Sequence, residues 1–108
     1  MVRVLSQSPG LIHQFLGELR DVNIQKDRMR FRRNIERIGE IAANEISKTL
    51  TYTEREVVTP LGIASMQALE RQPVICSIMR AGLPLHQGIL NYYDQAASGF
   101  IAAYRKHL

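Results

Sequence analysis

The first half of the chain carries apolar residues at helical spacing. After Ser8-Pro9, which suits an N-cap followed by proline at the first helical position, apolar side chains repeat every three or four residues. This pattern predicts a short amphipathic helix that ends near Arg20. The repeating apolar residues are Leu11, Ile12, Phe15, Leu16 and Leu19.

A longer helix is predicted after the polar connection at residues 21–27. It should run to about Thr49, with an apolar stripe on one side and most of its arginines elsewhere. The stripe that would face the core consists of Phe31, Ile35, Ile38, Ala42 and Ile46.

The pattern changes beyond Thr49. Residues 51–59 are rich in threonine and valine and predict a strand, which meets a turn at Pro60-Leu61-Gly62 as half of a hairpin. The next stretch, "ASMQALERQ", is consistent with a short helix or with an irregular connection, and Pro73 ends it.

A strand, a helix and a second strand are predicted between residues 74 and 105. The run "VICSIM" is typical of a strand covered on both faces, and "SGFIAAYR" predicts a strand that ends in Arg105. The helix between them, in "LPLHQGILNYY", is long enough for a right-handed crossover between parallel strands. Its buried side would consist of Leu85, Ile89, Leu90 and Tyr93.

The composition indicates a single domain, but the predicted sheet is too small to complete one. The 108 residues, 45% hydrophobic and 22% charged, fit one modest globular domain. A parallel sheet of two strands is not a finished fold, so we expect a portion of a larger domain or a part completed by a partner. The sequence contains no apolar run of membrane-spanning length, and residues 1–10 lack the apolar stretch of a secretion signal.

The net charge of +4 is concentrated in "KDRMRFRR", residues 26–33. Such a run on a helix is more often a solvated face than a nucleic-acid contact, and its one aromatic residue, Phe31, is assigned to the core. A basic balance also suits a phosphorylated small molecule.

Packing is the expected role of several reactive side chains. The lone Cys76 lies within a predicted buried strand; it excludes a disulfide framework within the chain and fits a reducing cytoplasm. Tyr92, Tyr93 and His86 are also assigned to packing, with a surface position open for His86. The sequence contains no His/Cys/Asp cluster with metal-ligand spacing, so no residue is assigned to a metal or to catalysis.

The stretch "SIMRAGLP" carries the candidate chemistry. Arg80 follows a predicted strand, and Arg105 ends the next one, so both would lie at the carboxyl edge of the sheet, where ligands bind in open α/β folds. Ala81 and Gly82 let the backbone approach a ligand, and the following helix N-terminus favours anions. These four residues predict a phosphate or pyrophosphate site. The alternative is an ordinary turn with two solvated arginines.

These motifs resemble those of uracil phosphoribosyltransferases. "SIMRAGLPLHQGIL" is similar to the family's Pro-Ile-Leu-Arg-Ala-Gly-Leu-Gly-Met followed shortly by glycine, and "VVTPLG" at 57–62 is similar to its Thr-Pro-Leu-Gly turn. Ser77, Met79 and Pro84 are mild departures from the common pattern. Further matches are "LRD" at 19–21, "FRR" at 31–33, "EISKTL" at 45–50 and "AAYR" at 102–105.

The resemblance covers only an N-terminal portion of that enzyme. The family's acidic residue with a Thr-Gly-Gly-Ser-like loop, which grips the ribose 5-phosphate, has no match here, and neither does its uracil-recognising segment. The implied fold is an incomplete α/β, type I phosphoribosyltransferase-like parallel sheet. Its parts would be N-terminal helices at 1–50, a β-hairpin arm at 51–72 and a strand–helix–strand core at 73–108.

The resemblance implies transfer of phosphoribosyl from phosphoribosyl pyrophosphate to uracil, giving UMP and pyrophosphate, in cytoplasmic pyrimidine salvage. Arg80, Ala81 and Gly82 would form the pyrophosphate loop, with a non-proline cis peptide at Met79-Arg80 or Arg80-Ala81, and Arg105 would contact the diphosphate. Mg²⁺ would arrive with the substrate, GTP is a candidate activator, and homodimers or higher oligomers are expected.

The isolated chain is expected to be inactive, because the ribose-phosphate loop and the base pocket are missing. One alternative is a non-enzymatic RNA-binding regulator of the same fold, with the arginine helix at 28–37 as its contact surface. Another is a fragment that serves only in dimerisation.

Overall fold

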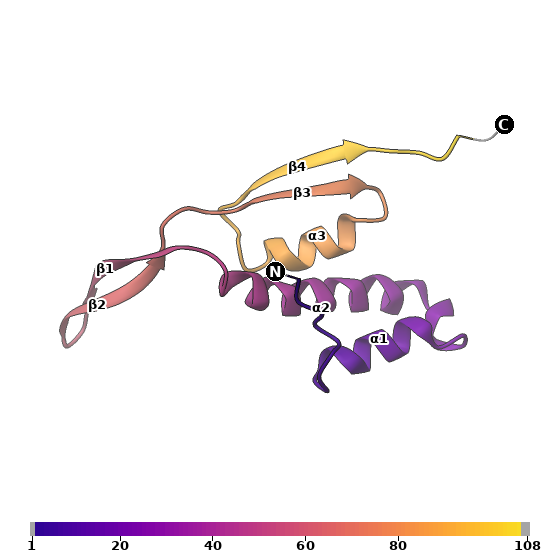
Figure 1. Ribbon diagram of the computed structural model, residues 1–108, viewed down its shortest axis with the longest axis horizontal. Coiled ribbons are helices and arrows are strands. Elements are labelled where there is room, and N and C mark those ends of the chain that lie inside the picture. Colours follow the sequence, from indigo (N-terminus) through magenta and orange to yellow (C-terminus); the bar gives the residue numbers. More distant parts are fainter. Residues whose placement is uncertain (1, 107–108) are drawn as a thin grey trace.

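The computed structural model describes residues 2–106 and has a mixed α/β fold (Figure 1). This agrees with the class predicted from the sequence, including the N-terminal helices and the β-hairpin. The elements, in chain order, are α1 (Ile12–Arg20), the 3₁₀ helix η1 (Ile24–Lys26), α2 (Arg28–Ser47), β1 (Tyr52–Thr59), β2 (Gly62–Leu69), β3 (Val74–Met79), α3 (Leu83–Leu90) and β4 (Ala97–Ala102).

The body of the molecule is a stack of layers, with the β3–β4 pair above α3, α3 above α2, and α2 above α1 (Figure 1). β3 and β4 are parallel, and their register runs from Val74 opposite Ala97 to Met79 opposite Ala102. The predicted crossover through a helix is therefore confirmed. The carboxyl ends of both strands lie at the same edge of this pair.

Helix α1 begins later than predicted. Its N-cap is Leu11, which makes no side-chain capping bond, so the prediction of a cap at Ser8 is wrong. The imidazole of His13 takes this role: Nδ1 accepts from the Gly10 N–H at 3.2 Å, and Nε2 lies 2.9 Å from the Ser6 carbonyl oxygen. A ring nitrogen within the first turn therefore satisfies a backbone donor that has no helical partner.

Helix α2 is capped by Asp27, whose carboxylate accepts from the Arg30 N–H at 3.0 Å. Its buried residues are Asn34, Gly39 and Ala43. The predicted stripe is therefore wrong at its ends, since Phe31 is 38% exposed and Ile46 is 37% exposed.

This difference arises because α2 meets α3 through main chain. A Cβ atom on Gly39 would lie 2.6 Å from the Leu85 carbonyl oxygen, and one on Gly88 would collide with the Glu36 carbonyl group. Glycine at both positions lets the two backbones touch, and large apolar side chains are excluded from the crossing.

A small core forms beside this crossing, from Ala43, Ile75 and Tyr93. The Tyr93 hydroxyl donates to the Ala43 carbonyl oxygen at 2.8 Å. Packing is thus confirmed for Tyr93, whereas Tyr92 is 64% exposed and does not pack. On α3, Leu85 is 39% exposed, so its prediction as a buried residue is also wrong.

β1 and β2 form an antiparallel hairpin, with Thr59 opposite Gly62 and Tyr52 opposite Leu69. Neither reading of "ASMQALERQ", helix or irregular connection, is correct, because most of it belongs to β2. Pairing with β1 overrides the helical propensity of alanine, glutamine and leucine. Gly62 has φ +133°, a backbone conformation that glycine adopts readily, just after the turn at Pro60-Leu61.

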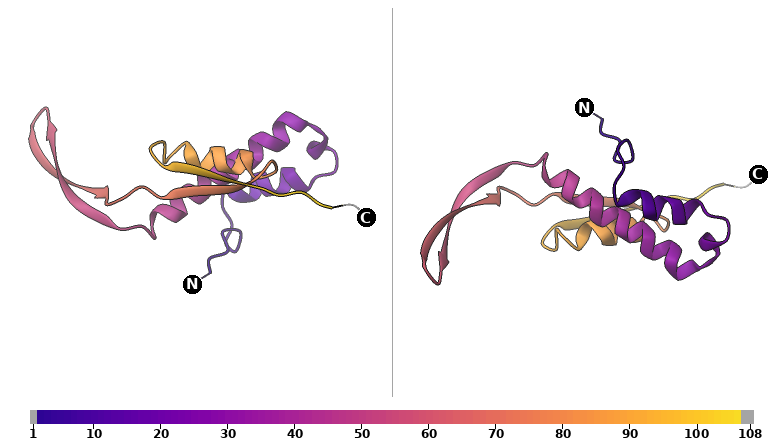
Figure 2. Two further views of the ribbon diagram at one scale, coloured as in Figure 1. Left: turned by 90° about the horizontal axis from the view of Figure 1, so that it is seen from above. Right: turned by 90° about the horizontal axis from the view of Figure 1, so that it is seen from below.

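The hairpin projects away from the layered body (Figure 2). At its base, Leu69 packs against the core, and the Tyr52 hydroxyl donates to the Ser47 carbonyl oxygen at 2.8 Å. Most of the rest is exposed, including Val58, Leu61 and Ile63.

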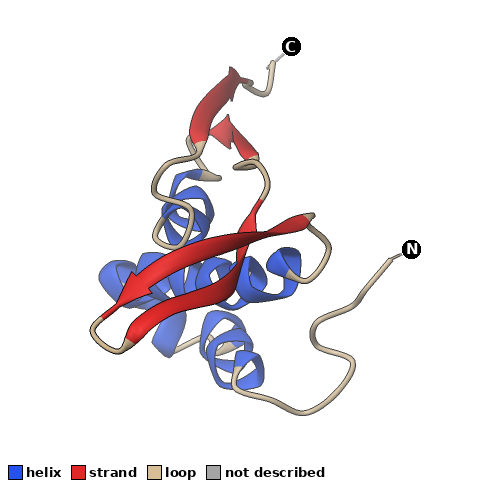
Figure 3. Ribbon diagram, turned by 90° about the vertical axis from the view of Figure 1, so that its left-hand side faces the viewer, coloured by secondary structure: helices blue, strands red, loops and turns tan. Residues whose placement is uncertain are grey.

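Helices cover one face of the β3–β4 pair (Figure 3). Ile75 is buried on that face, whereas Val74, Cys76 and Ile78 on the other are exposed. The prediction of a strand covered on both faces, with Cys76 in the core, is wrong for residues 2–106. The apolar sequence of β3 predicts a covering layer on this second face as well, and α1, α2 and α3 do not cover it.

Candidate functional site

A tight turn joins β3 to α3 and contains Arg80, Ala81 and Gly82. The Gly82 N–H donates to the Ile78 carbonyl oxygen at 3.0 Å, and the Leu83 N–H donates to the Arg80 carbonyl oxygen at 3.1 Å. The peptide bond between Met79 and Arg80 is cis, which confirms the expectation at one of its two bonds. The turn therefore folds back onto the end of its own strand.

Gly82 is required by this close return. A Cβ atom there would lie 2.7 Å from the Ile78 carbonyl oxygen and 3.5 Å from the Ser77 Cβ. The first contact is with main chain, so a side chain would force the turn away from β3. Gly82 is also the N-cap of α3, and Pro84 lies in the first turn of that helix, where a missing N–H costs no helical bond.

The two predicted arginines follow the two parallel strands. Arg80 comes one residue after the end of β3, and Arg105 comes three residues after the end of β4. The prediction that β4 runs to Arg105 is therefore wrong. β3 ends at Met79, opposite Ala102, and beyond that pair the tail has no strand to bond with.

Both arginines are exposed. Within residues 2–106, neither guanidinium has an ion pair or a hydrogen bond, and the Ala81 N–H has no hydrogen-bond partner. The turn thus presents a cation and a main-chain donor beside the N-terminus of α3. Chemically, such an arrangement suits an anion with several oxygens.

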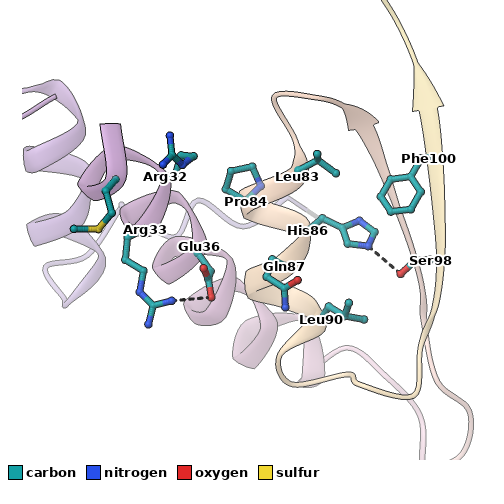
Figure 4. Close-up of a pocket in the computed structure, with 11 residues that line it drawn as sticks. Arg32, Arg33, Glu36, Leu83, Pro84, His86, Gln87, Leu90, Ser98 and Phe100 are labelled. Carbon is teal, nitrogen blue, oxygen red and sulfur yellow. Dashed lines mark hydrogen bonds and ion pairs between the residues drawn. The ribbon is translucent and has the colours of Figure 1, made fainter. Parts of the chain in front are cut away.

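His86, one turn into α3, is buried and hydrogen-bonded at both ring nitrogens. Its Nδ1 lies 2.5 Å from the Ser77 hydroxyl oxygen. Its Nε2 lies 3.0 Å from the Ser98 hydroxyl oxygen, a contact that Figure 4 shows. Its ring stacks on Phe100 with 4.9 Å between centroids. The expected packing role is confirmed. The sequence reading did not identify Ser77 and Ser98 as its partners, although Ser77 stands where the family pattern has proline.

A hollow of about 560 Å³ lies between α2, α3 and β4, with His86 and Ser98 on one wall (Figure 4). None of the four predicted site residues lines it; its α3 wall begins at Leu83. On the α2 wall, Arg33 is paired with Glu36 at 3.2 Å. Arg32, on the same wall, is exposed and has no ion pair among the described residues. The turn combines an unpaired arginine with an open main-chain donor and a helix N-terminus, so we take the turn as the candidate anion site.

Several arginines of α2 make contacts within the protein. Arg30 pairs with Glu18 at 3.0 Å, and Arg37 donates to Asn34 at 3.0 Å and lies over the Phe15 ring. The ion pairs of Arg30 and Arg33 with glutamates offset part of the positive charge that the helix offers to a nucleic acid, and the contacts of Arg37 hold its guanidinium against the protein. Hydrogen bonds from Asn34 and then Arg30 lower the pKa of Glu18 from its ordinary value of 4.5.

Tyr93 has the other shifted acid group. Burial, and then the neighbouring Tyr52, raise the pKa of its hydroxyl above the ordinary 10.0. This hydroxyl supports the α2–α3 core and lies outside the turn, so we assign it no chemistry.

In the part of the chain that the structure describes, no group of three or more His, Cys, Asp or Glu residues is placed to hold a metal ion. No helix within residues 2–106 is both long and apolar enough to cross a membrane.

Comparisons with known proteins place these features in context. Residues 5–108 match the family model described as uracil phosphoribosyltransferase. The chain is 50% identical over 103 residues to the uracil phosphoribosyltransferase of Porphyromonas gingivalis, covering 95% of this chain and 48% of that protein. It is 42% identical over 107 residues to the one of Sulfolobus acidocaldarius, covering 95% and 47%.

The fold also matches a solved structure, the AQ2163 protein from Aquifex aeolicus. The TM-score is 0.71 at 26% identity, over 86% of this chain and 44% of that one. The chain spans about half the length of the curated relatives that it matches.

Proposed function

The chain belongs to the uracil phosphoribosyltransferase family, and from this premise we propose that it provides the pyrophosphate-binding part of such an enzyme. The reaction is transfer of phosphoribosyl from phosphoribosyl pyrophosphate to uracil, giving UMP and pyrophosphate. The observation that carries the proposal is the β3–α3 turn, where the unpaired Arg80 and the open Ala81 N–H flank a helix N-terminus.

The chemistry of the reaction explains why these groups suit it. When the bond between the ribose and the pyrophosphate breaks, negative charge grows on the pyrophosphate oxygens. Donors that are already fixed in place stabilise this charge without reorganising, which lowers the barrier. Arg80 would pair with two oxygens through its planar guanidinium, and the Ala81 N–H would supply a further donor. Arg105, on the tail beyond β4, would add a second cation.

The isolated chain is proposed to bind pyrophosphate without catalysing transfer. Residues 1–108 contain no match to the family's ribose-phosphate loop or to its base-recognising segment. The described residues also offer no carboxylate cluster for Mg²⁺, so no residue is assigned to the metal. Mg²⁺ would be carried by the diphosphate oxygens of the substrate.

The setting of the reaction is proposed from the family alone. It comprises pyrimidine salvage in the cytoplasm and assembly of homodimers or higher oligomers, for which the exposed hairpin is a candidate contact. GTP activation is retained as a hypothesis to be tested by titration.

Isothermal titration of pyrophosphate with Mg²⁺ tests the proposal. The wild-type chain is compared with Arg80→Ala and with a matched control, Arg55→Ala, which removes an exposed arginine from β1. Loss of a charge-assisted hydrogen bond costs about 1.5–3 kcal/mol, so Arg80→Ala should weaken binding by roughly 10- to 150-fold. Arg55→Ala should bind as the wild type does. Absence of saturable binding, or equal loss in both variants, would contradict the proposed anion site.

A further inference from the structure

The buried imidazole of His86 connects three elements of the core. It belongs to α3, lies 2.5 Å from the hydroxyl oxygen of Ser77 on β3, and lies 3.0 Å from that of Ser98 on β4. The ring is only 5% exposed and stacks on Phe100. One side chain thus bonds both strands of the parallel pair to the helix that crosses between them.

The hydrogen-bond donors and acceptors of this cluster are matched. A neutral imidazole has one N–H donor and one nitrogen acceptor, and each serine hydroxyl can either donate or accept. In either tautomer, one serine accepts from the ring and the other donates to it. Both ring nitrogens are therefore satisfied, as a buried polar group requires. Loss of either serine would leave one ring nitrogen without this partner.

The cluster also closes a ring of bonds around the β3–α3 turn. The His86 N–H donates to the Gly82 carbonyl oxygen at 2.9 Å, and the Gly82 N–H donates to Ile78 at 3.0 Å. Ser77 lies directly under Gly82, where an added Cβ would be 3.5 Å from the Ser77 Cβ. The path from Ser77 through the turn to His86 is thus closed by the bond between the two side chains, and Arg80 lies on that path.

We propose that His86, with Ser77 and Ser98, is a positioning unit that holds the Arg80–Gly82 turn in its anion-binding form and fixes it to β4. This inference rests on the proposed function for the identity of the ligand. His86 is not a catalytic residue here, since its ring nitrogens are directed to the two serines. Its effect on an anion passes through the main chain of the turn.

Four variants separate the bonds of the cluster. Ser77→Ala removes the partner of Nδ1, and Ser98→Ala removes the partner of Nε2. His86→Leu removes both bonds and keeps an apolar side chain in the space. His86→Asn places an amide near the position of Nδ1 and leaves Ser98 without a partner. The control is Tyr93→Phe, which removes a buried hydrogen bond to Ala43 at a distance from the turn.

Amide hydrogen exchange, measured by NMR on the 108-residue chain, tests the positioning role without any ligand. The reporters are the Gly82 and Leu83 amides, read against Ala96, whose N–H donates to the Tyr93 carbonyl oxygen. Removal of one hydrogen bond should accelerate exchange at the two turn amides by about five- to tenfold relative to Ala96 in Ser77→Ala. His86→Asn should retain most of the protection that Ser77→Ala loses, because it keeps a partner for Ser77. Tyr93→Phe should show no selective change at the turn. Equal acceleration at all three amides, or none at the turn, would overturn the proposal.

Pyrophosphate titration of the same variants provides the second measurement. Ser77→Ala and His86→Leu should weaken binding, and His86→Asn should bind more tightly than His86→Leu. If wild-type chain binds no pyrophosphate but exchange at the turn changes selectively, the proposed function fails while the positioning role stands. If wild-type chain binds and Ser77→Ala binds equally well, the positioning role in anion binding is refuted.

Discussion

Gly39→Ala tests whether α2 and α3 are held at main-chain contact. The new Cβ would lie 2.6 Å from the Leu85 carbonyl oxygen, 3.2 Å from the Gly88 Cα and 3.3 Å from the Ile89 nitrogen. All three are main-chain atoms, which cannot rotate away as a side chain can. Since ordinary contact begins near 3.4 Å, the helices would have to separate by about 0.8 Å at this point.

The size of the effect follows from two opposing terms. Overpacking costs about 1–3 kcal/mol, and a gap of 0.5–1 Å forfeits roughly a quarter to a half of the local dispersion energy. Alanine recovers up to about 1 kcal/mol through its higher helix propensity. Because the clash is with main chain, we expect the upper end of the first term and a net loss of about 2 kcal/mol in the free energy of unfolding.

Urea denaturation followed by far-ultraviolet circular dichroism measures this loss. Gly17→Ala is the matched control: it is a helical glycine of α1, and an added Cβ would meet nothing within 4 Å. This control should gain about 0.5–1 kcal/mol. Gly88→Ala should lose stability at least as much as Gly39→Ala, because its Cβ would collide with the Glu36 carbonyl group. The reasoning is refuted if Gly39→Ala is as stable as the wild type.

Three further predictions concern single side chains. Tyr93→Phe should lose about 1 kcal/mol by urea denaturation. It should also remove a fall in stability above pH 10. This fall arises because the hydroxyl has a higher pKa in the folded state, so the unfolded state loses its proton first as the pH rises. The prediction is contradicted if the variant is as stable as the wild type both below and above pH 10. The lowered pKa of Glu18 stabilises the fold above pH 4.5, and this contribution should disappear as the pH falls through the folded-state pKa. Glu18→Gln should flatten that part of the pH profile, and an unaltered profile would count against the assignment. Cys76, which is exposed, should react with a maleimide in the native chain about as fast as in urea, and strong native protection would show that its strand face is covered.

The residues that punctuate the chain allowed much of this fold to be predicted. β3 and α3 were predicted from an apolar run that ends at Arg80 and from Pro84 at the start of a helix, and β4 was predicted from the second apolar run, which ends at Arg105. The hairpin arm at 51–72 was predicted, but the residues of β2 taken alone were assigned to a helix or an irregular connection. Alanine, glutamine and leucine favour helices locally, and the pairing that decides the structure of β2 is supplied by β1. The turn at Pro60-Leu61-Gly62 was the signal from which the hairpin was predicted.

The candidate site was predictable where it is local in sequence. The turn from Arg80 to Gly82 lies within one short motif, so its order of strand, turn and helix could be inferred. The bonds of His86 could not, because Ser77 and Ser98 come from two different strands and meet only after the crossover forms. Burial of Gly39 in place of Phe31 was missed for a related reason, since only the opposing glycine of α3 makes main-chain contact possible.

The hairpin has a consequence for how the chain folds. The contact between Tyr93 and Ala43 joins segments that are 50 residues apart, and β1 and β2 lie between them in the sequence. Hairpin pairing is local, so it can form early and bring Tyr52 next to Leu69. Only residues 48–51 and 70–73 then remain as free connection between α2 and β3. The loop is roughly threefold shorter, so the free-energy cost of closing it falls by about 1 kcal/mol. The projecting arm would thus speed assembly of the body from which it points away.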